Sequence, residues 1–487
     1  MNTMTRVVEK QPHVVFIPFP AQSHIKCMLK LAKLLHHKGI HITFINTRSN
    51  HKKLVESGGA HDFKDIPGFQ FRTVSDYPSS GAEDDGVEPM TPTLAEVWMY
   101  LADNFFDSFL DIVSGLESTP ATCIICDGFM TYTNMITAAE KLKIPIILFW
   151  TMAACGFMGF YQVKVLTDKG LLPLKDESYL TNGYLEMEID WIPGMEGCRL
   201  KDLPQYMLVT KLDDPIFKYH YGTAQAAHNV SYMIIHTFEE LEARLVNEIK
   251  YTFPNVYTVG PLQLLLNQIE EKENKRTGLN CYSLWKEEPE CLQWLESKEP
   301  GSVVYVNFGS LAVMSLEDLT EFGWGLVNSN HEFLWIIRTD LVKEQPVVWP
   351  QELEEEMRTK GFLAKWCSQE EVLSHPSVGG FLTHGGWGSI IESLSAGLPM
   401  ICWPYSGDQR TNCRQMCNHW DVGMEIGRSV KRDEVEKLVK LLMDGLEGKR
   451  MKEKAMQWKK MAEMATSSNG SSSLDIEKLA NQIINFS

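Results

Sequence analysis

The sequence predicts an α/β fold with two domains whose parallel sheets face each other across a cleft. The chain has 487 residues, which is more than a single hydrophobic core normally serves. Short apolar runs that do not alternate with polar residues indicate buried parallel strands, and helical patterns separate these runs. Because one such series occupies each half of the chain, we expect two domains of similar size, with ligands bound at the carboxyl ends of the strands.

The first series begins with the run HVVFIPF at residues 13–19, which predicts a buried strand. The residues from Ile25 to Leu35 then keep helical spacing, and Gly39 can end that helix. The run IHITFINT predicts a second strand, so the three elements form a β-α-β unit. The same order recurs in ATCIICDGF, TNMITAAEKLK and IPIILFW.

The second series follows a charged segment, which we expect to be a linker at about residues 267–280. The runs SVVYVNFGS, FLWIIR, GFLAKW, GGFLTHGG and PMICWP predict five strands. An amphipathic helix is expected at about residues 472–487, and we expect it to pack back on the first domain. The domains are therefore expected to cover residues 1–255 and 256–471.

Charge and composition restrict the classes of partner. The formal net charge is −17, so the surface repels nucleic-acid phosphates and anionic lipid, and we expect neither as a partner. The N-terminal residues lack the apolar core of a signal peptide, and no apolar stretch is long enough to cross a bilayer. We therefore expect a cytoplasmic protein without an integral membrane segment. Cys123 and Cys126 lie in a run typical of a buried strand, so we interpret them as core rather than as a zinc or redox site.

The stretch from Trp366 to Gln409 carries the most specific functional pattern. It begins with a flat aromatic ring, on which a base can stack. A glycine-rich turn, HGGWGS, then leads into an apolar-periodic helix, and backbone N–H groups at a helix N-terminus bind phosphate. A carboxylate and an amide close the stretch, and both can read sugar hydroxyls. The pattern predicts a site for a nucleotide joined to a sugar.

This stretch resembles the signature box of the plant family 1 UDP-glycosyltransferases, and the resemblance extends over essentially the whole chain. It implies the GT-B fold, in which two Rossmann-like domains bind the acceptor and the UDP-sugar respectively. It also implies an inverting transfer that uses UDP-glucose as co-substrate and needs no metal or other cofactor. The sequence contains no Asp-x-Asp triad, where metal-dependent sugar transferases usually hold their cation. We expect the protein to be a monomer.

The resemblance also implies which residues bind the donor. Trp366 would stack on uracil, Gln369 would hold the uridine, and Glu392 would accept hydrogen bonds from both ribose hydroxyls. Residues expected near the diphosphate and elsewhere along the nucleotide are Ser310, Cys367, His384, Trp387, Gly388 and Ser389. Residues expected to contact glucose are Asp408, Gln409 and Thr151. Glucose-using members share Gln409, whereas a glucuronic acid donor would require a basic residue, and Arg410 lies next to Gln409.

One departure from the family pattern bears directly on the donor site. Gly388 stands where the family usually has Asn. This change gives up one hydrogen bond near the phosphate or acceptor oxygen, typically about 1 kcal/mol. It also lets the backbone approach a ligand closely.

The transfer requires a general base, because an acceptor hydroxyl must lose its proton as it attacks the anomeric carbon. His24 stands at the start of the first predicted helix, where the family has its catalytic histidine. Asp127 ends the strand CIICD and matches the aspartate that supports this histidine. We therefore expect a His24–Asp127 pair that resembles the histidine and aspartate of hydrolases.

Bulky apolar residues of the first domain are candidates for the wall of the acceptor site, although each can equally belong to the core. They are Phe19, Phe129, Met152, Phe157, Phe160, Tyr161, Trp191 and Met207. Such a wall suits a rigid lipophilic molecule. Segments such as AACGFMGFY and IDWIPGMEG resemble the branch that contains the steviol glucosyltransferases. This implies transfer to a diterpenoid such as steviol at its 13-hydroxyl, with another terpenoid, a phenolic or a cyanohydrin as the alternative.

Two further hypotheses belong to other classes. A sugar-nucleotide epimerase or hydrolase can share the fold, but the acceptor-side pair of His24 and Asp127 argues against it. A non-catalytic UDP-sugar-binding protein is the third reading, with Gly388 as a sign of decay.

Overall fold

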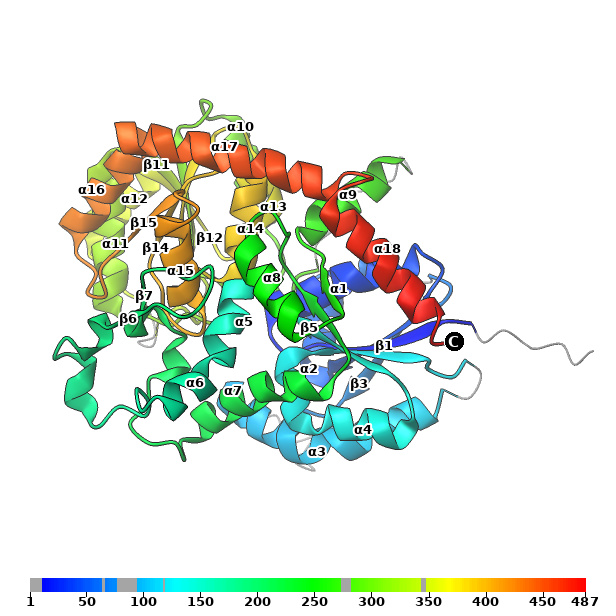
Figure 1. Cartoon of the computed structure of the whole chain (residues 1–487). Helices are drawn as coiled ribbons and strands as arrows, with labels where there is room; N and C mark the ends of the chain where they lie inside the picture. Colours follow the sequence, from blue (N-terminus) through cyan, green and yellow to red (C-terminus); the bar gives the residue numbers. More distant parts are fainter. Residues whose placement is uncertain (1–10, 64–65, 77–93, 117–118, 273–281, 343–346) are drawn as a thin grey trace, which may run out of the picture.

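The computed structural model describes residues 11–63, 66–76, 94–116, 119–272, 282–342 and 347–487. It contains two α/β domains (Figure 1), each built on one parallel sheet with helices against its faces. This architecture agrees with the α/β prediction.

The first domain contains a seven-stranded sheet in the spatial order β3-β2-β1-β4-β5-β8-β9, and every pairing is parallel. Its strands are β1 (His13–Ile17), β2 (His41–Thr47), β3 (Phe69–Val74), β4 (Cys123–Asp127), β5 (Ile146–Trp150), β8 (Tyr232–Ile235) and β9 (Val256–Thr258). All residues of β1, β4 and β5 are buried, because helices cover both faces of the sheet. Since β9 belongs to this sheet, the first domain continues beyond the expected boundary at residue 255.

The helices of the first domain are α1 (Gln22–His36), α2 (Arg48–Glu56), α3 (Leu94–Ser114), α4 (Met135–Leu142), α5 (Ala154–Tyr161), α6 (Val163–Asp168), α7 (Pro215–Ala226), α8 (Ala243–Thr252) and α9 (Leu262–Lys272). A two-stranded antiparallel ribbon of β6 (Glu188–Ile189) and β7 (Cys198–Arg199) lies between α6 and α7 in the chain. Of the expected linker at residues 267–280, the first six residues form the end of α9. Residues 273–280 lie outside the described residues.

The second domain contains a six-stranded parallel sheet in the order β12-β11-β10-β13-β14-β15. Its strands are β10 (Val303–Asn307), β11 (Glu332–Ile336), β12 (Gly361–Ala364), β13 (Val378–Thr383), β14 (Met400–Cys402) and β15 (Gly423–Glu425). The five apolar runs found in the sequence account for β10 to β14. Its helices are α10 (Glu290–Glu296), α11 (Leu316–Ser329), α12 (Gln351–Lys360), α13 (Gln369–Ser374), α14 (Trp387–Ala396), α15 (Gln409–Asn418), α16 (Arg432–Met443) and α17 (Leu446–Thr466).

The last helix, α18 (Ser471–Ile484), returns to the first domain (Figure 1). Its apolar face joins a core cluster that contains residues of β1, β2 and α1. Two polar contacts fix the helix in register: the Asp475 carboxylate accepts from the Thr258 N–H at 2.9 Å, and the Ser472 hydroxyl donates to the Gly260 carbonyl at 2.5 Å.

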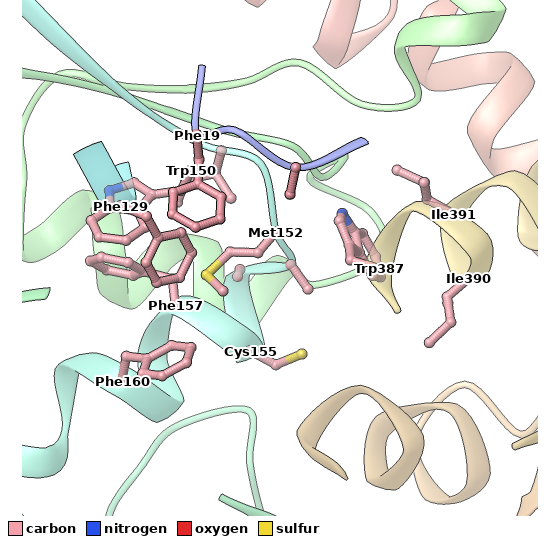
Figure 2. Packing of buried hydrophobic residues seen from close by; sticks show 14 of the residues in the cluster. Phe19, Phe129, Trp150, Met152, Cys155, Phe157, Phe160, Trp387, Ile390 and Ile391 are labelled. Atoms are coloured by element: carbon pink, nitrogen blue, oxygen red, sulfur yellow. The ribbon is translucent and has the colours of Figure 1, made fainter. Parts of the chain in front are cut away.

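The two domains share one apolar core cluster. Phe19, Phe129 and Met152 of the first domain belong to the same cluster as Trp387 and Ile391 of α14 (Figure 2). This continuous packing connects the carboxyl ends of the two sheets. Among the described residues, none of the helices combines the length and hydropathy needed to cross a membrane.

Candidate active site

A cavity of about 580 Å³ lies between the domains and is lined by residues from both. Each sheet contributes loops that follow the carboxyl ends of its strands, where α/β proteins bind their ligands. These loops bring together His24 after β1, Thr151 after β5, Ser310 after β10, His384 after β13 and Asp408 after β14.

His24 lies in the first turn of α1, and its Nδ1 is 2.8 Å from Oδ2 of Asp127. The Asp127 side chain is fully buried, whereas His24 is 19% exposed and faces the cavity. The second carboxylate oxygen of Asp127 accepts from the Phe129 N–H at 3.0 Å, which fixes the carboxylate plane. An ionised carboxylate only accepts hydrogen bonds, so Nδ1 of His24 carries the proton and Nε2 is left as the acceptor.

Thr151 completes this group, because its hydroxyl lies 2.8 Å from Nδ1 of His24 and 3.3 Å from Oδ2 of Asp127. We expected Thr151 only as a contact for the sugar. It lines the cavity, but it also contacts both members of the histidine–aspartate pair. The sequence carried no signal for this second contact.

Gly128 has a steric role beside Asp127. A Cβ atom at this position would lie 2.5 Å from the ring of Trp150. The absence of a side chain therefore lets the chain turn directly after β4, which directs the aspartate toward α1.

Trp366 lies between β12 and α13, at the end of the cavity where the sequence predicts the nucleotide. Trp285 stacks against it, with ring centroids 4.6 Å apart and an interplanar angle of 29°. Trp285 does not line the cavity, so it supports the Trp366 ring from behind. Cys367 is buried, and its thiol lies 3.3 Å from the hydroxyl of Tyr305.

Gln369 and Glu392 contact each other at the same end. Gln369 Nε2 donates to Oε2 of Glu392 at 2.8 Å, and its Oε1 accepts from the amide of Asn307 at 2.8 Å. The other oxygen of Glu392 pairs with Lys26 of the first domain at 2.8 Å. The carboxylate thus lies in the cavity, held from two sides.

The turn between β13 and α14 presents backbone N–H groups to the cavity. The first helical hydrogen bond of α14 runs from Ile390 N–H to the Gly386 carbonyl, so the three preceding amides at residues 387–389 remain for an anion. Gly385 has φ of +81°, and a Cβ there would lie 2.6 Å from the sulfur of Cys402. Gly388 and Ser389 both line the cavity.

Trp387 lines the cavity, and its side chain also contacts the first domain. Its indole N–H donates to the His236 carbonyl of the first domain at 2.5 Å, and the ring is buried. The indole thereby connects α14 to the residue that follows β8.

Ser310 and His384 both line the cavity, and the loop that carries Ser310 lies against the His384 ring. The guanidinium of Arg338 donates to the carbonyls of Gly309 and Ala312, the second at 2.9 Å, and so holds the loop that carries Ser310. Burial, together with the nearby Arg338 cation, lowers the pKa of His384 to about 4. His384 is therefore neutral at pH 7, and the buried arginine supplies positive charge near the turn.

Asp408 and Gln409 lie at the start of α15. Gln409 Oε1 accepts from the N–H groups of Tyr405 and Ser406, each at 2.8 Å, which leaves its NH₂ group to donate to a ligand. Asp408 Oδ2 accepts from the Asn412 amide at 3.1 Å, and burial raises its pKa. Arg410, the possible partner of a glucuronic acid, does not line the cavity.

The acceptor wall is predicted only in part. Phe19, Phe129, Met152 and Phe160 line the cavity. Four other candidates do not line it: these are Phe157, Tyr161, Trp191 and Met207. Phe157 lies on the core side of α5 and packs on Trp150 (Figure 2). Neither the spacing nor the hydropathy of AACGFMGFY shows that Phe157 faces the core while Phe160 faces the cavity.

The other three excluded residues each have a different environment. Tyr161 donates or accepts a hydrogen bond with His228 at 3.0 Å and packs on Phe253. Trp191 lies under the ammonium of Lys169, 4.7 Å from its ring centroid. Met207 is fully buried in the core.

Four aromatic residues that the sequence did not single out also line the cavity: Trp98, Tyr206, Tyr219 and His220. His220 stacks between Phe160 and Tyr206, with centroid distances of 5.3 and 4.5 Å. Burial lowers the pKa of His220 to about 4, so this ring is neutral. For Tyr219 and His220 the sequence offered one signal, the aromatic run FKYHY in α7, but such a run is equally compatible with a core position.

Three comparisons place this geometry among known proteins. The sequence model of the family described as "UDP-glucoronosyl and UDP-glucosyl transferase" matches residues 70–463. The chain belongs to this family. The enzyme is 68% identical over 483 residues to UDP-glycosyltransferase 85C1 of Stevia rebaudiana, with 99% of each chain covered. It is 48% identical to the 7-deoxyloganetin glucosyltransferase of Catharanthus roseus, with 96% of each chain covered.

A solved structure supports the same assignment. The UDP complex of UDP-glucose: anthocyanidin 3-O-glucosyltransferase matches with a TM-score of 0.80 at 26% identity, covering 99% of this chain and 100% of that chain. The predicted membership in the plant family 1 UDP-glycosyltransferases and the predicted GT-B fold are thereby confirmed. Among the described residues, no group of three or more His, Cys, Asp or Glu side chains is arranged to hold a metal ion.

Proposed function

We propose that this UDP-glycosyltransferase transfers glucose from UDP-glucose, with inversion, to a hydroxyl or carboxyl group of a lipophilic small molecule. The first candidate acceptor is a diterpenoid such as steviol, at its 13-hydroxyl. The observation that carries the proposal is that His24 and the donor residues of the Trp366–Gln409 stretch line one cavity. A general base and a nucleotide site on separate faces would not support transfer.

The donor would lie along the second domain. Trp366 offers a ring for the uracil, Glu392 has acceptor oxygens for the ribose hydroxyls, and the first amides of α14 suit the diphosphate. Asp408 and the NH₂ group of Gln409 would then contact glucose, which orients the anomeric carbon toward the first domain. Ser310 and neutral His384 complete the phosphate end.

The reaction would be a single displacement. The acceptor oxygen attacks the anomeric carbon, its proton passes to Nε2 of His24, and UDP leaves with the electrons of the broken carbon–oxygen bond. Asp127 then stabilises the imidazolium, as its 2.8 Å contact with Nδ1 allows. Attack from the face opposite UDP inverts the anomeric configuration.

The acceptor assignment has its own support. The wall made by Phe19, Phe129, Phe160 and the stacked rings around His220 is apolar and rigid, which suits a rigid lipophilic molecule. A relative from Catharanthus roseus is named for a different acceptor, 7-deoxyloganetin. Another terpenoid is therefore the second candidate. A phenolic or a cyanohydrin is a further alternative within the same activity.

We also propose that the enzyme acts as a cytoplasmic monomer without a metal ion. Gel filtration with light scattering tests the oligomeric state. Transfer in the presence of excess EDTA tests the metal.

The His24→Ala variant tests the catalytic proposal. Wild type and variant are compared for UDP binding by calorimetry, and for glucoside formation by mass spectrometry with a panel of terpenoid, phenolic and cyanohydrin acceptors. We expect UDP to bind both proteins equally, while the variant loses transfer by about 10²–10⁴-fold. Transfer near the wild-type rate would refute the role of His24. UDP release without any acceptor would favour a hydrolase instead.

A further inference from the structure

Two lysines of α1 in the first domain, Lys26 and Lys30, line the nucleotide end of the cavity. Lys26 lies two residues after His24 in the same helix. Its ammonium contacts Glu392 of α14 at 2.8 Å and Glu370 of α13 at 2.5 Å. Lys30, one turn further along α1, also pairs with Glu370. Two cations and two carboxylates therefore form one cluster between the domains.

This cluster is largely shielded from solvent, so its charges are not screened as surface pairs are. The Lys30 and Glu392 side chains are 6% and 8% exposed, and those of Lys26 and Glu370 are 22% and 24% exposed. Burial opposes the charged form of Lys26, but the two carboxylates outweigh it and hold the pKa of Lys26 above its usual range. Lys26 is consequently a fixed positive charge beside Glu392.

The contact with Lys26 does not saturate the Glu392 carboxylate. A carboxylate has two oxygens and about four acceptor positions. Lys26 uses one position on Oε1, and the Gln369 amide uses one on Oε2. Each oxygen therefore keeps one acceptor position, which matches the two hydroxyls of a ribose. The two protein donors fix the plane in which these positions lie.

We propose that Lys26 is a positioning residue that aligns the Glu392 carboxylate for the ribose of the donor and ties this carboxylate to the helix carrying His24. The inference rests on the proposed role of Glu392 in ribose binding. It adds that the first domain, through Lys26, determines how well the second domain recognises the 2′-hydroxyl. Ribose recognition and the general base are then joined by two residues of one helical turn.

A binding cycle tests this role without an acceptor. UDP and 2′-deoxy-UDP are titrated into wild type, Lys26→Met and Lys26→Arg, and the dissociation constants are measured by calorimetry. A hydrogen bond to a charged group contributes about 1.5–3 kcal/mol, so wild type should prefer UDP by about 10- to 100-fold. Lys26→Met should reduce this preference to about threefold or less, whereas Lys26→Arg should retain most of it.

A matched control uses another lysine–glutamate pair, which lies just beyond the C-terminal end of α1. Lys38 pairs with Glu477 of α18 and lies outside the cavity. Lys38→Met should leave both dissociation constants unchanged. Thermal unfolding of each variant shows whether it is folded before titration, and Lys26→Arg keeps the test valid if Lys26→Met does not fold.

The outcomes separate the inference from the function on which it rests. If wild type binds UDP without preference over 2′-deoxy-UDP, the role of Glu392 fails, and the inference fails with it. If wild type prefers UDP but Lys26→Met weakens both nucleotides equally, Lys26 acts only through its charge, and positioning is refuted. If Lys26→Met binds UDP more tightly than wild type, Lys26 competes with the ribose, and the inference is refuted.

Discussion

Gly388 offers the most direct test of how the phosphate turn binds the donor. This residue is the second of α14, and the family resemblance of the sequence implies Asn at this position. A Cβ atom built at this position has no other atom within 4 Å, so a side chain fits without displacing its surroundings. Glycine is therefore not required here by packing, and Gly388→Asn should be accommodated.

The expected gain follows from two opposing contributions. A side-chain amide that donates to an anionic phosphate contributes about 1.5–3 kcal/mol, and ordering that side chain costs about 0.5–1.5 kcal/mol. The net gain of about 1 kcal/mol corresponds to an approximately fivefold lower dissociation constant for UDP-glucose. Calorimetric titration of UDP-glucose into wild type and Gly388→Asn measures this difference.

Gly388→Ala is the matched control, because it adds the Cβ atom without the amide. Replacing a helical glycine with alanine stabilises the fold by about 0.5–1 kcal/mol, but it should leave donor affinity unchanged. The reasoning is refuted if Gly388→Asn binds UDP-glucose no better than Gly388→Ala. Weaker binding by both variants would mean that the donor approaches the backbone at Gly388 too closely for any side chain.

Three further variants test other parts of the site. Asp127→Asn should lower kcat by about 10²–10⁴-fold with little change in the donor KM, as UDP-release kinetics would show, and a drop below about tenfold would contradict the pair with His24. Trp285→Leu removes the ring behind Trp366 and should raise the KM for UDP-glucose about 2- to 10-fold, and an unchanged KM in donor saturation curves would exclude this support. His220 has a pKa of about 4 when folded, against 6.5 for an ordinary histidine, so the unfolded chain takes up its proton first as the pH falls below about 6.5. The stability of wild type relative to His220→Phe should therefore fall by about 2 kcal/mol between pH 7.5 and pH 5, and urea unfolding with no such difference would contradict the neutral buried ring.

The sequence was sufficient for the α/β fold and for the elements around the nucleotide site. Apolar runs such as HVVFI in β1 and VVYVN in β10 are buried on both faces of their sheets. A run of apolar residues predicts such a strand without knowledge of which residues pack against it. The segment from Trp366 to Gln409 supplies β13, α14 and the start of α15 in one continuous stretch. Local patterns therefore carried most of the information about that side of the cavity.

The acceptor wall could not be predicted to the same extent, because its residues come from separate segments of the first domain. Trp98 of α3 stacks on Tyr219 of α7 at 5.2 Å, although more than one hundred positions separate them in the chain. Phe157 and Phe160 are three positions apart in α5, yet only Phe160 reaches the cavity. The same apolar and aromatic residue types occur in a core and in a pocket wall, so only the packing of the helices shows which of the two a given residue belongs to.

Contacts between the domains explain why the sequence motif alone does not define the whole nucleotide site. Trp387 lies within the motif, but its indole N–H is directed to the His236 carbonyl of the other domain. Glu392 also lies within the motif, and its carboxylate pairs with Lys26 of α1. Neither partner could be inferred from the motif, because each depends on how two separate sheets meet. The geometry of the nucleotide end of the cavity therefore depends on both domains, and substitutions in α1 should alter nucleotide recognition as directly as substitutions in the motif itself.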